Sequence, residues 1–201
     1  YDCDGGKFTL SRLNQPVTIA AALNVQQPNL NLLRAAFSAD GVLDDQTKLT
    51  PVVAEALRRL AGVQGSSTLA NVSVEIADLP GTLLGETVGK TIRIDRDAAG
   101  YGWFIDSTPA DDSEFQALAD NLLVAKPGSV AENRPDLLTA VMHEMGHVLG
   151  YEHDEAEGLM NASLPLGERR SLTSADASSQ LAVDKLLSSW DEDEKKEQSW
   201  L

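Results

Sequence analysis

The sequence predicts a single domain of the α/β (α+β) class, because two kinds of periodicity occur along one chain of 201 residues. Some segments repeat apolar side chains at the 3.6-residue spacing of an amphipathic helix, and others alternate apolar and polar side chains as half-buried strands do. Hydrophobic residues make up 42% of the chain and charged residues 23%, which is typical of a globular domain with a core of ordinary size.

The first part of the chain predicts a strand and a helix. An apolar run at residues 17–25 is a candidate first strand. Thr50 followed by Pro51 indicates a helix start, because the hydroxyl can cap the helix and a proline at the first helical position loses no hydrogen bond. Apolar residues then recur at helical spacing as far as Gly62, so we expect a helix over residues 50–61.

Two alternating segments follow. Residues 72–76 and residues 91–95 each alternate apolar and polar side chains, which predicts two half-buried strands. The second strand comes directly after the turn-forming pair Gly89-Lys90, which favours an antiparallel arrangement of the strands.

The second half of the chain predicts two more helices. Apolar residues at helical spacing indicate one helix over residues 136–149 and another over roughly residues 176–190. The last eleven residues, 191–201, contain five acidic residues and two lysines, and we expect them to form a solvated acidic tail.

Charge and hydropathy exclude two kinds of partner. The formal net charge is −15 and the lysine and arginine residues form no basic stripe, so a nucleic-acid partner is not expected. No apolar run reaches the roughly 18 residues that a membrane-spanning helix needs. A strongly acidic surface also fits a secreted protein in calcium-rich surroundings.

All three histidines of the chain lie within eleven residues. His143 and His147 are four residues apart on the predicted helix, so both imidazoles project from one face and can bind the same ion. Gly150 can adopt the left-handed conformation that ends a helix, which would bring His153 back as a third ligand. Three histidines with an open fourth position are typical of a catalytic zinc site, and Glu144 lies beside the first ligand as a candidate general base.

This segment resembles the extended zinc-binding motif of the metzincin metallopeptidases. Gly158-Leu159-Met160 resembles their Met-turn, whose methionine lies beneath the zinc site. The short interval between His153 and Met160 is similar to that of the matrixins, whereas Asp154 resembles the residue that adamalysins have after the third histidine. The resemblance covers about residues 48–170 and is to matrixin-like domains of large bacterial surface or secreted proteins.

The resemblance implies a zinc-dependent endopeptidase with a metzincin-type zincin fold. In that fold a twisted mixed sheet, mostly parallel, accompanies the active-site helix, and a small irregular C-terminal subdomain lies below the cleft. His143, His147 and His153 would bind zinc, Glu144 would activate water, and Met160, Gly150 and Asp154 would support the site. An extended peptide substrate would pair with an antiparallel edge strand, for which residues 91–95 or the segment after them are the candidate.

Two further ligand hypotheses arise from the resemblance. Matrixins bind structural calcium, and Asp106, Asp111 and Asp112 supply the hard oxygen atoms that calcium prefers, although a solvated acidic loop has the same composition. Matrixin proenzymes are inhibited by a cysteine thiolate on the zinc. Cys3 is the only cysteine here and is a candidate for that role, but its flanking residues do not reproduce the inhibitory motif.

These interpretations divide the chain into three parts. Residues 1–45 form an N-terminal arm or pro-segment, residues 46–190 form the catalytic domain, and residues 191–201 form the tail. We expect a monomeric domain of a larger secreted or cell-surface protein. Two alternatives stay open, namely a self-processing module that cuts its own parent chain and a non-catalytic peptide-binding or adhesion domain.

Overall fold

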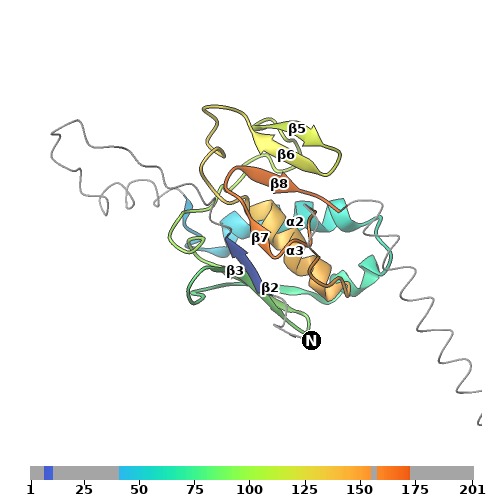
Figure 1. Cartoon of the computed structure of the whole chain (residues 1–201). Coiled ribbons are helices and arrows are strands. Elements are labelled where there is room, and N and C mark those ends of the chain that lie inside the picture. The colour runs from blue at the N-terminus through green and yellow to red at the C-terminus, as the bar shows by residue number, and fades with distance from the viewer. Residues whose placement is uncertain (1–6, 11–40, 155–157, 173–201) are drawn as a thin grey trace, which may run out of the picture.

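The structure, a computed structural model, describes residues 7–10, 41–154 and 158–172 (Figure 1). Its helices are α2 (Gln46–Leu60), the 3-10 helix η2 (Ser66–Asn71) and α3 (Leu137–Val148). Its strands are β1 (Lys7–Leu10), β2 (Ser73–Ala77), β3 (Leu83–Val88), β4 (Thr91–Asp95), β5 (Phe115–Ala119), β6 (Leu122–Ala125), β7 (Ser163–Leu164) and β8 (Glu168–Arg170). The expected strand at 17–25, helix at 176–190, acidic tail and Cys3 lie outside the described residues.

The described residues form a mixed α/β structure with two sheets. The larger sheet has the strand order β2-β4-β3-β1-β7, and the smaller antiparallel sheet has the order β5-β6-β8. Figure 1 shows α3 between the two sheets, and it contacts β3 and β4 on one side and β8 on the other. The described C-terminal residues 158–172 therefore join both sheets through β7 and β8, where the resemblance implied a separate irregular part.

The larger sheet confirms two predicted strands but corrects how they pair. The strands β2 and β4 lie within one residue of the predicted ranges, yet they run parallel to each other. The expected antiparallel hairpin instead joins β4 to β3 across Gly89 and Lys90. Sequence analysis missed β3 because Gly85 and two adjacent leucines interrupt any alternation of side chains. The sheet is mixed, with two parallel and two antiparallel pairings among its five strands.

Strand β1 belongs to the N-terminal residues that the sequence analysis interprets as an arm or pro-segment. Residues 7–10 lie between β3 and β7, antiparallel to β3 and parallel to β7. The sequence signal was weak, because four residues are too few to establish a period.

Helix α2 begins one turn earlier than predicted. The carboxylate of Asp45 accepts a hydrogen bond from the backbone N–H of Thr47 at 2.7 Å, so the N-cap is Asp45 rather than Thr50. Pro51 therefore lies inside the helix, where its ring leaves one backbone carbonyl without the usual donor. The prediction failed because both residues carry plausible start signals, and the true cap lies five residues before Thr50.

Helix α3 is the central element of the core. Every residue from Leu137 to Gly146 is buried, because the helix is packed against α2 and against strands of both sheets. The carboxylate of Asp136 caps its first turn by accepting from the backbone N–H of Thr139 at 3.0 Å. The predicted range of 136–149 is thus confirmed, and its rigid surroundings fix the side chains that it carries.

Among the described residues, no helix has the length and hydrophobicity needed to cross a membrane.

Candidate metal centre

The three histidines meet at the C-terminal half of α3. His143 and His147 project from consecutive turns of the helix, and Gly150, with φ of +93°, reverses the chain so that His153 returns toward them. The Nε2 atoms of the three rings lie 3.1–3.2 Å from one another. Within the described part of the chain, this is the group of side chains positioned to hold a metal ion. The predicted ligand cluster is confirmed as a geometric site.

Backbone carbonyls fix the orientation of two of the rings. The Nδ1 atom of His143 lies 2.6 Å from the carbonyl oxygen of Leu159, and that of His147 lies 2.8 Å from the carbonyl oxygen of Tyr151. A carbonyl oxygen only accepts, so Nδ1 must carry the proton and donate in each ring. In the neutral rings Nε2 therefore presents a lone pair toward the other histidines, and a hydrogen bond from the second ring nitrogen to an oxygen acceptor is usual for metal-ligating histidine.

The spacing of the Nε2 atoms fits a zinc ion. Bonds of about 2.0–2.1 Å at tetrahedral angles separate ligand nitrogens by about 3.3 Å, close to the separation seen here. Three lone pairs this close together repel one another unless a cation lies between them. The donor set, all imidazole nitrogen, suits zinc far better than calcium, which takes oxygen ligands.

Burial keeps the histidines neutral. Desolvation lowers the pKa of His143 well below its ordinary value, and it lowers the pKa of His147 and His153 as well. The carbonyl hydrogen bonds of His143 and His147 act in the opposite direction but are the weaker effect. The rings are therefore ready to bind a metal at neutral pH without first losing a proton.

Glu144 is fully buried. The hydroxyl of Thr87 donates to its Oε2 at 2.7 Å, and Oε1 has no hydrogen-bond partner in the described part of the chain. Burial raises the pKa of Glu144 to about 8, against the smaller effect of the Thr87 hydrogen bond. A buried carboxylate oxygen without a hydrogen bond lowers the stability of the fold, and next to the histidine cluster it is suited to accepting a proton.

Strand β3 supplies the wall beside Glu144. A Cβ atom placed on Gly85 would lie 2.7 Å from Oε1 of Glu144, so only glycine lets the strand approach this closely. Thr87 lies two residues further along the same face of β3. Neither residue was predicted as part of the site. No local signal could have found them, because Thr87 and Glu144 are 57 residues apart in the sequence.

Met160 lies directly against the helix that carries the histidines. It is buried, and a Cβ atom on Gly146 would lie 2.5 Å from its sulfur. Asp154 is half-buried rather than buried, and its backbone N–H donates to the carbonyl oxygen of Met160 at 3.1 Å. The predicted support of the site by Met160 and Gly150 therefore has a geometric basis.

Gly146→Ala should destabilise the protein through Met160. The new methyl group would overlap the sulfur, and overpacking of this kind costs about 1–3 kcal/mol, more than the roughly 0.5–1 kcal/mol that alanine gains over glycine in a helix. Urea unfolding of the metal-free protein measures the change. Gly62→Ala is the control, because a Cβ atom there meets nothing within 4 Å. Equal midpoints for the two variants would show that Met160 moves aside without cost.

The acidic residues proposed for calcium are arranged around an arginine instead. The guanidinium of Arg169 donates to Asp106 and to Asp112, each at 2.8 Å, and it also donates to Asp136. The carboxylate of Asp111 accepts from the backbone N–H of Ser113. Because a buried cationic side chain already neutralises two of the three candidates, the structure gives the calcium prediction no support.

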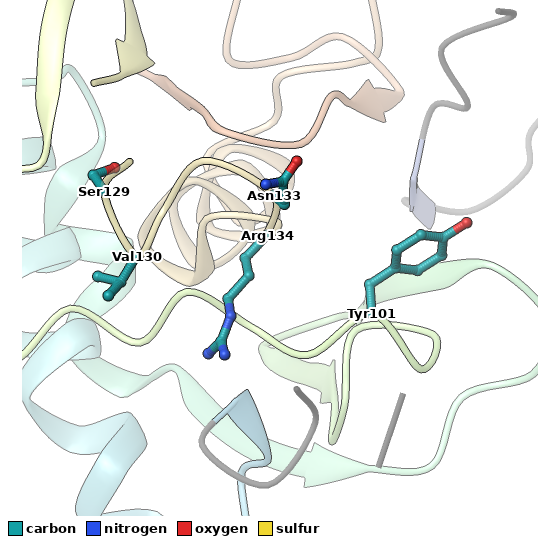
Figure 2. A pocket seen from close by; sticks show the side chains of 5 residues that line it. All are labelled: Tyr101, Ser129, Val130, Asn133 and Arg134. Atoms are coloured by element: carbon teal, nitrogen blue, oxygen red, sulfur yellow. The ribbon is translucent and has the colours of Figure 1, made fainter. Parts of the chain in front are cut away.

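A separate hollow of about 440 Å³ lies apart from the histidines. Figure 2 shows its lining side chains, with Tyr101 on one side and a segment before α3 on the other. That segment contributes Ser129, Val130, Asn133 and Arg134. None of the predicted site residues lines the hollow, so it is not part of the histidine site.

Comparison of the chain with protein families, curated proteins and solved structures found no match in any of the three. The fold and the site define a mixed α/β domain with a three-histidine cluster positioned to hold a metal ion. Any more specific function depends on the chemistry of this site.

Proposed function

We propose that this protein is a zinc-dependent endopeptidase of the metzincin class, similar to the matrixins and acting outside the cell. The observation that carries the proposal is the convergence of three Nε2 atoms beside a buried, partly unpartnered glutamate. A structural zinc site usually has four protein ligands, commonly with cysteines, whereas this cluster has three histidines. Three ligands and an adjacent base favour catalysis over a purely structural role.

His143, His147 and His153 would hold the zinc ion. When bound there, zinc would supply Lewis-acid polarisation of a peptide carbonyl and would lower the pKa of a coordinated water. The hydrogen bonds from Nδ1 to the carbonyls of Leu159 and Tyr151 keep two rings in the ligating tautomer. The Met160 side chain, packed under Gly146, supports the turn of helix between His143 and His147.

Glu144 would be the general base and then the general acid. Among the described residues no donor bonds to its Oε1, and Thr87 donates to Oε2, so Oε1 can accept the proton of the attacking water. The same carboxyl would pass the proton to the leaving amine. Burial raises the pKa of Glu144 to about 8, which brings it near the pH at which one group can both accept and return a proton.

Strand β3 would bind the substrate backbone. Sequence analysis named residues 91–95, which form β4, for this role. Both candidate strands are paired on each edge, β4 with β2 and β3, and β3 with β4 and β1, so their position relative to the site decides between them. Strand β3 contacts α3 and lies against Glu144 through Gly85. An extended peptide paired with β3 would lie beside the base, which is the β-strand addition mode of recognition.

Metal dependence tests this function. Zinc-loaded protein should cut an unfolded protein substrate into peptides, the stripped protein should not, and restored zinc should recover the activity. Mass spectrometry of the products gives the cut sites, and metal analysis should give one zinc per chain. Protein that holds one zinc and leaves both unfolded proteins and peptides intact would contradict the proposal and favour a binding role.

A further inference from the structure

Arg170, at the end of β8, is a buried arginine that the proposed chemistry does not use. Its side chain is almost fully buried, and its Nε and Nη2 atoms donate to Oε2 of Glu168 at 3.0 and 2.7 Å. The remaining nitrogen, Nη1, donates to the carbonyl oxygens of Gly158 and Ser163 at 3.4 and 3.0 Å. The glutamate thus neutralises the guanidinium, and Nη1 holds two points of the neighbouring backbone.

These two points lie on either side of the carbonyl that orients His143. Gly158 comes directly before Leu159, whose carbonyl oxygen lies 2.6 Å from Nδ1 of His143, and Ser163 is the first residue of β7. One guanidinium nitrogen therefore ties together the two ends of residues 158–163. The Leu159 carbonyl is held between those ends.

The backbone of Arg170 is anchored on the helix that carries the histidines. Its N–H donates to the hydroxyl oxygen of Thr139 at 3.0 Å, and that hydroxyl donates to the carboxylate of Asp136, the residue that caps α3. Thr139 lies about one helical turn before His143, and both residues are completely buried. Arg170 therefore links α3, on which β8 lies, to residues 158–163 (Figure 1).

We infer that Arg170 is a positioning residue of the metal centre, which keeps the Leu159 carbonyl against Nδ1 of His143 so that Nε2 presents its lone pair to the ion. The inference rests on the proposed function only for the identity of that ion as zinc. Arginine suits the task because its rigid fork can pair with a carboxylate and still direct a third nitrogen at the backbone, whereas the compact ammonium group of lysine has no such fork.

Zinc affinity, measured by competition with a chromophoric chelator, is the first test. Arg170→Met should bind zinc about 10–100-fold more weakly than wild type, the usual effect of removing the support of a ligating histidine. Methionine leaves Glu168 without its cation, so a second variant combines Arg170→Met with Glu168→Met and leaves no unpaired charge. It should show the same loss, and so should Arg170→Lys.

Arg58→Met is the matched control for zinc affinity. Arg58 also donates to a glutamate, Glu55, through Nε and Nη2, but it lies on α2 with its side chain mostly exposed. Its replacement should leave the zinc affinity at the wild-type value. Equal affinities in Arg170→Met and Arg58→Met would overturn the inference.

NMR of the histidine side chains in the metal-free protein separates positioning from a general loosening of the fold. In wild type, Nδ1 should carry the proton in both His143 and His147. The Arg170 variants should lose or shift the Nδ1–H signal of His143 only, because His147 donates to the carbonyl of Tyr151 instead. An unchanged His143 signal, or the loss of both signals together, would contradict a positioning role.

Neither readout depends on hydrolysis, so this inference and the proposed function fail separately. If wild type binds zinc but cuts no protein, while the Arg170 variants lose zinc affinity and the His143 signal, the positioning role stands and the endopeptidase fails. If zinc-loaded wild type cuts protein, while the Arg170 variants match Arg58→Met in affinity and in both signals, the endopeptidase stands and the positioning role fails.

Discussion

Glu144→Gln should lower kcat/KM for peptide cleavage by about 10²–10⁴-fold. Glutamine keeps the shape of the side chain and can still accept the hydrogen bond from Thr87, but its amide cannot take a proton from water. Zinc content should remain one ion per chain, because Glu144 is not among the grouped ligands. The rate is measured with zinc-loaded wild type and variant on one cleavage site identified by mass spectrometry.

The stability of the same variant without metal is the control for folding. In the wild type the pKa of Glu144 rises from its ordinary value of 4.5 to about 8 on folding, because burial disfavours the charged form. Wild-type stability should therefore fall as the pH rises between these values, since the unfolded chain releases this proton first. Glutamine does not ionise, so the variant should gain stability over wild type, and the gain should be larger at pH 9 than at pH 5. A variant with unchanged cleavage rate would remove Glu144 from the mechanism.

Arg169→Met should lower the free energy of unfolding by about 3–5 kcal/mol, the cost of leaving buried charges unpaired. The arginine side chain is completely buried and joins three carboxylates, of which Asp106 and Asp136 are also buried. It makes a two-pronged contact with Asp136, which caps α3, through Nε at 3.1 Å and Nη2 at 2.9 Å. Loss of Arg169 would therefore disturb the N-terminus of the helix that carries the histidines.

Urea unfolding measures this effect, with Arg93→Met as the matched control. Arg93 pairs with Glu86 at the surface, where such pairs contribute about 0–1 kcal/mol. Arg169→Lys should also be strongly destabilised, because an ammonium group cannot reproduce the planar fork or the stacking on Phe115, whose ring centroid lies 4.4 Å from the guanidinium carbon. If Arg169→Met unfolded at the same urea concentration as Arg93→Met, the buried network would not be a main source of stability.

The features that the sequence determined by itself are those encoded within one continuous segment. The four-residue spacing of His143 and His147 places them on one helical face whatever surrounds the helix, and Gly150 supplies the reversal that returns His153. The bounds of α3 and β4 follow from the same kind of local period, because apolar side chains recur at helical spacing in one segment and alternate with polar ones in the other.

Only the tertiary structure decided which segments meet. The partners of Glu144 and of the acidic loop come from far along the chain: Thr87 is 57 residues from Glu144, and Arg169 is 63 residues from Asp106. Strand β3 has no clear alternation, and β1 has only four residues, so neither reveals its place next to the site. A strand can form backbone hydrogen bonds with any strand that the folded core places beside it. A carboxylate can likewise be neutralised by any cationic side chain that the core brings close. Local periodicity carries no information about that choice, which is why it located the histidine cluster but not the partners of the acidic loop or the strand beside Glu144.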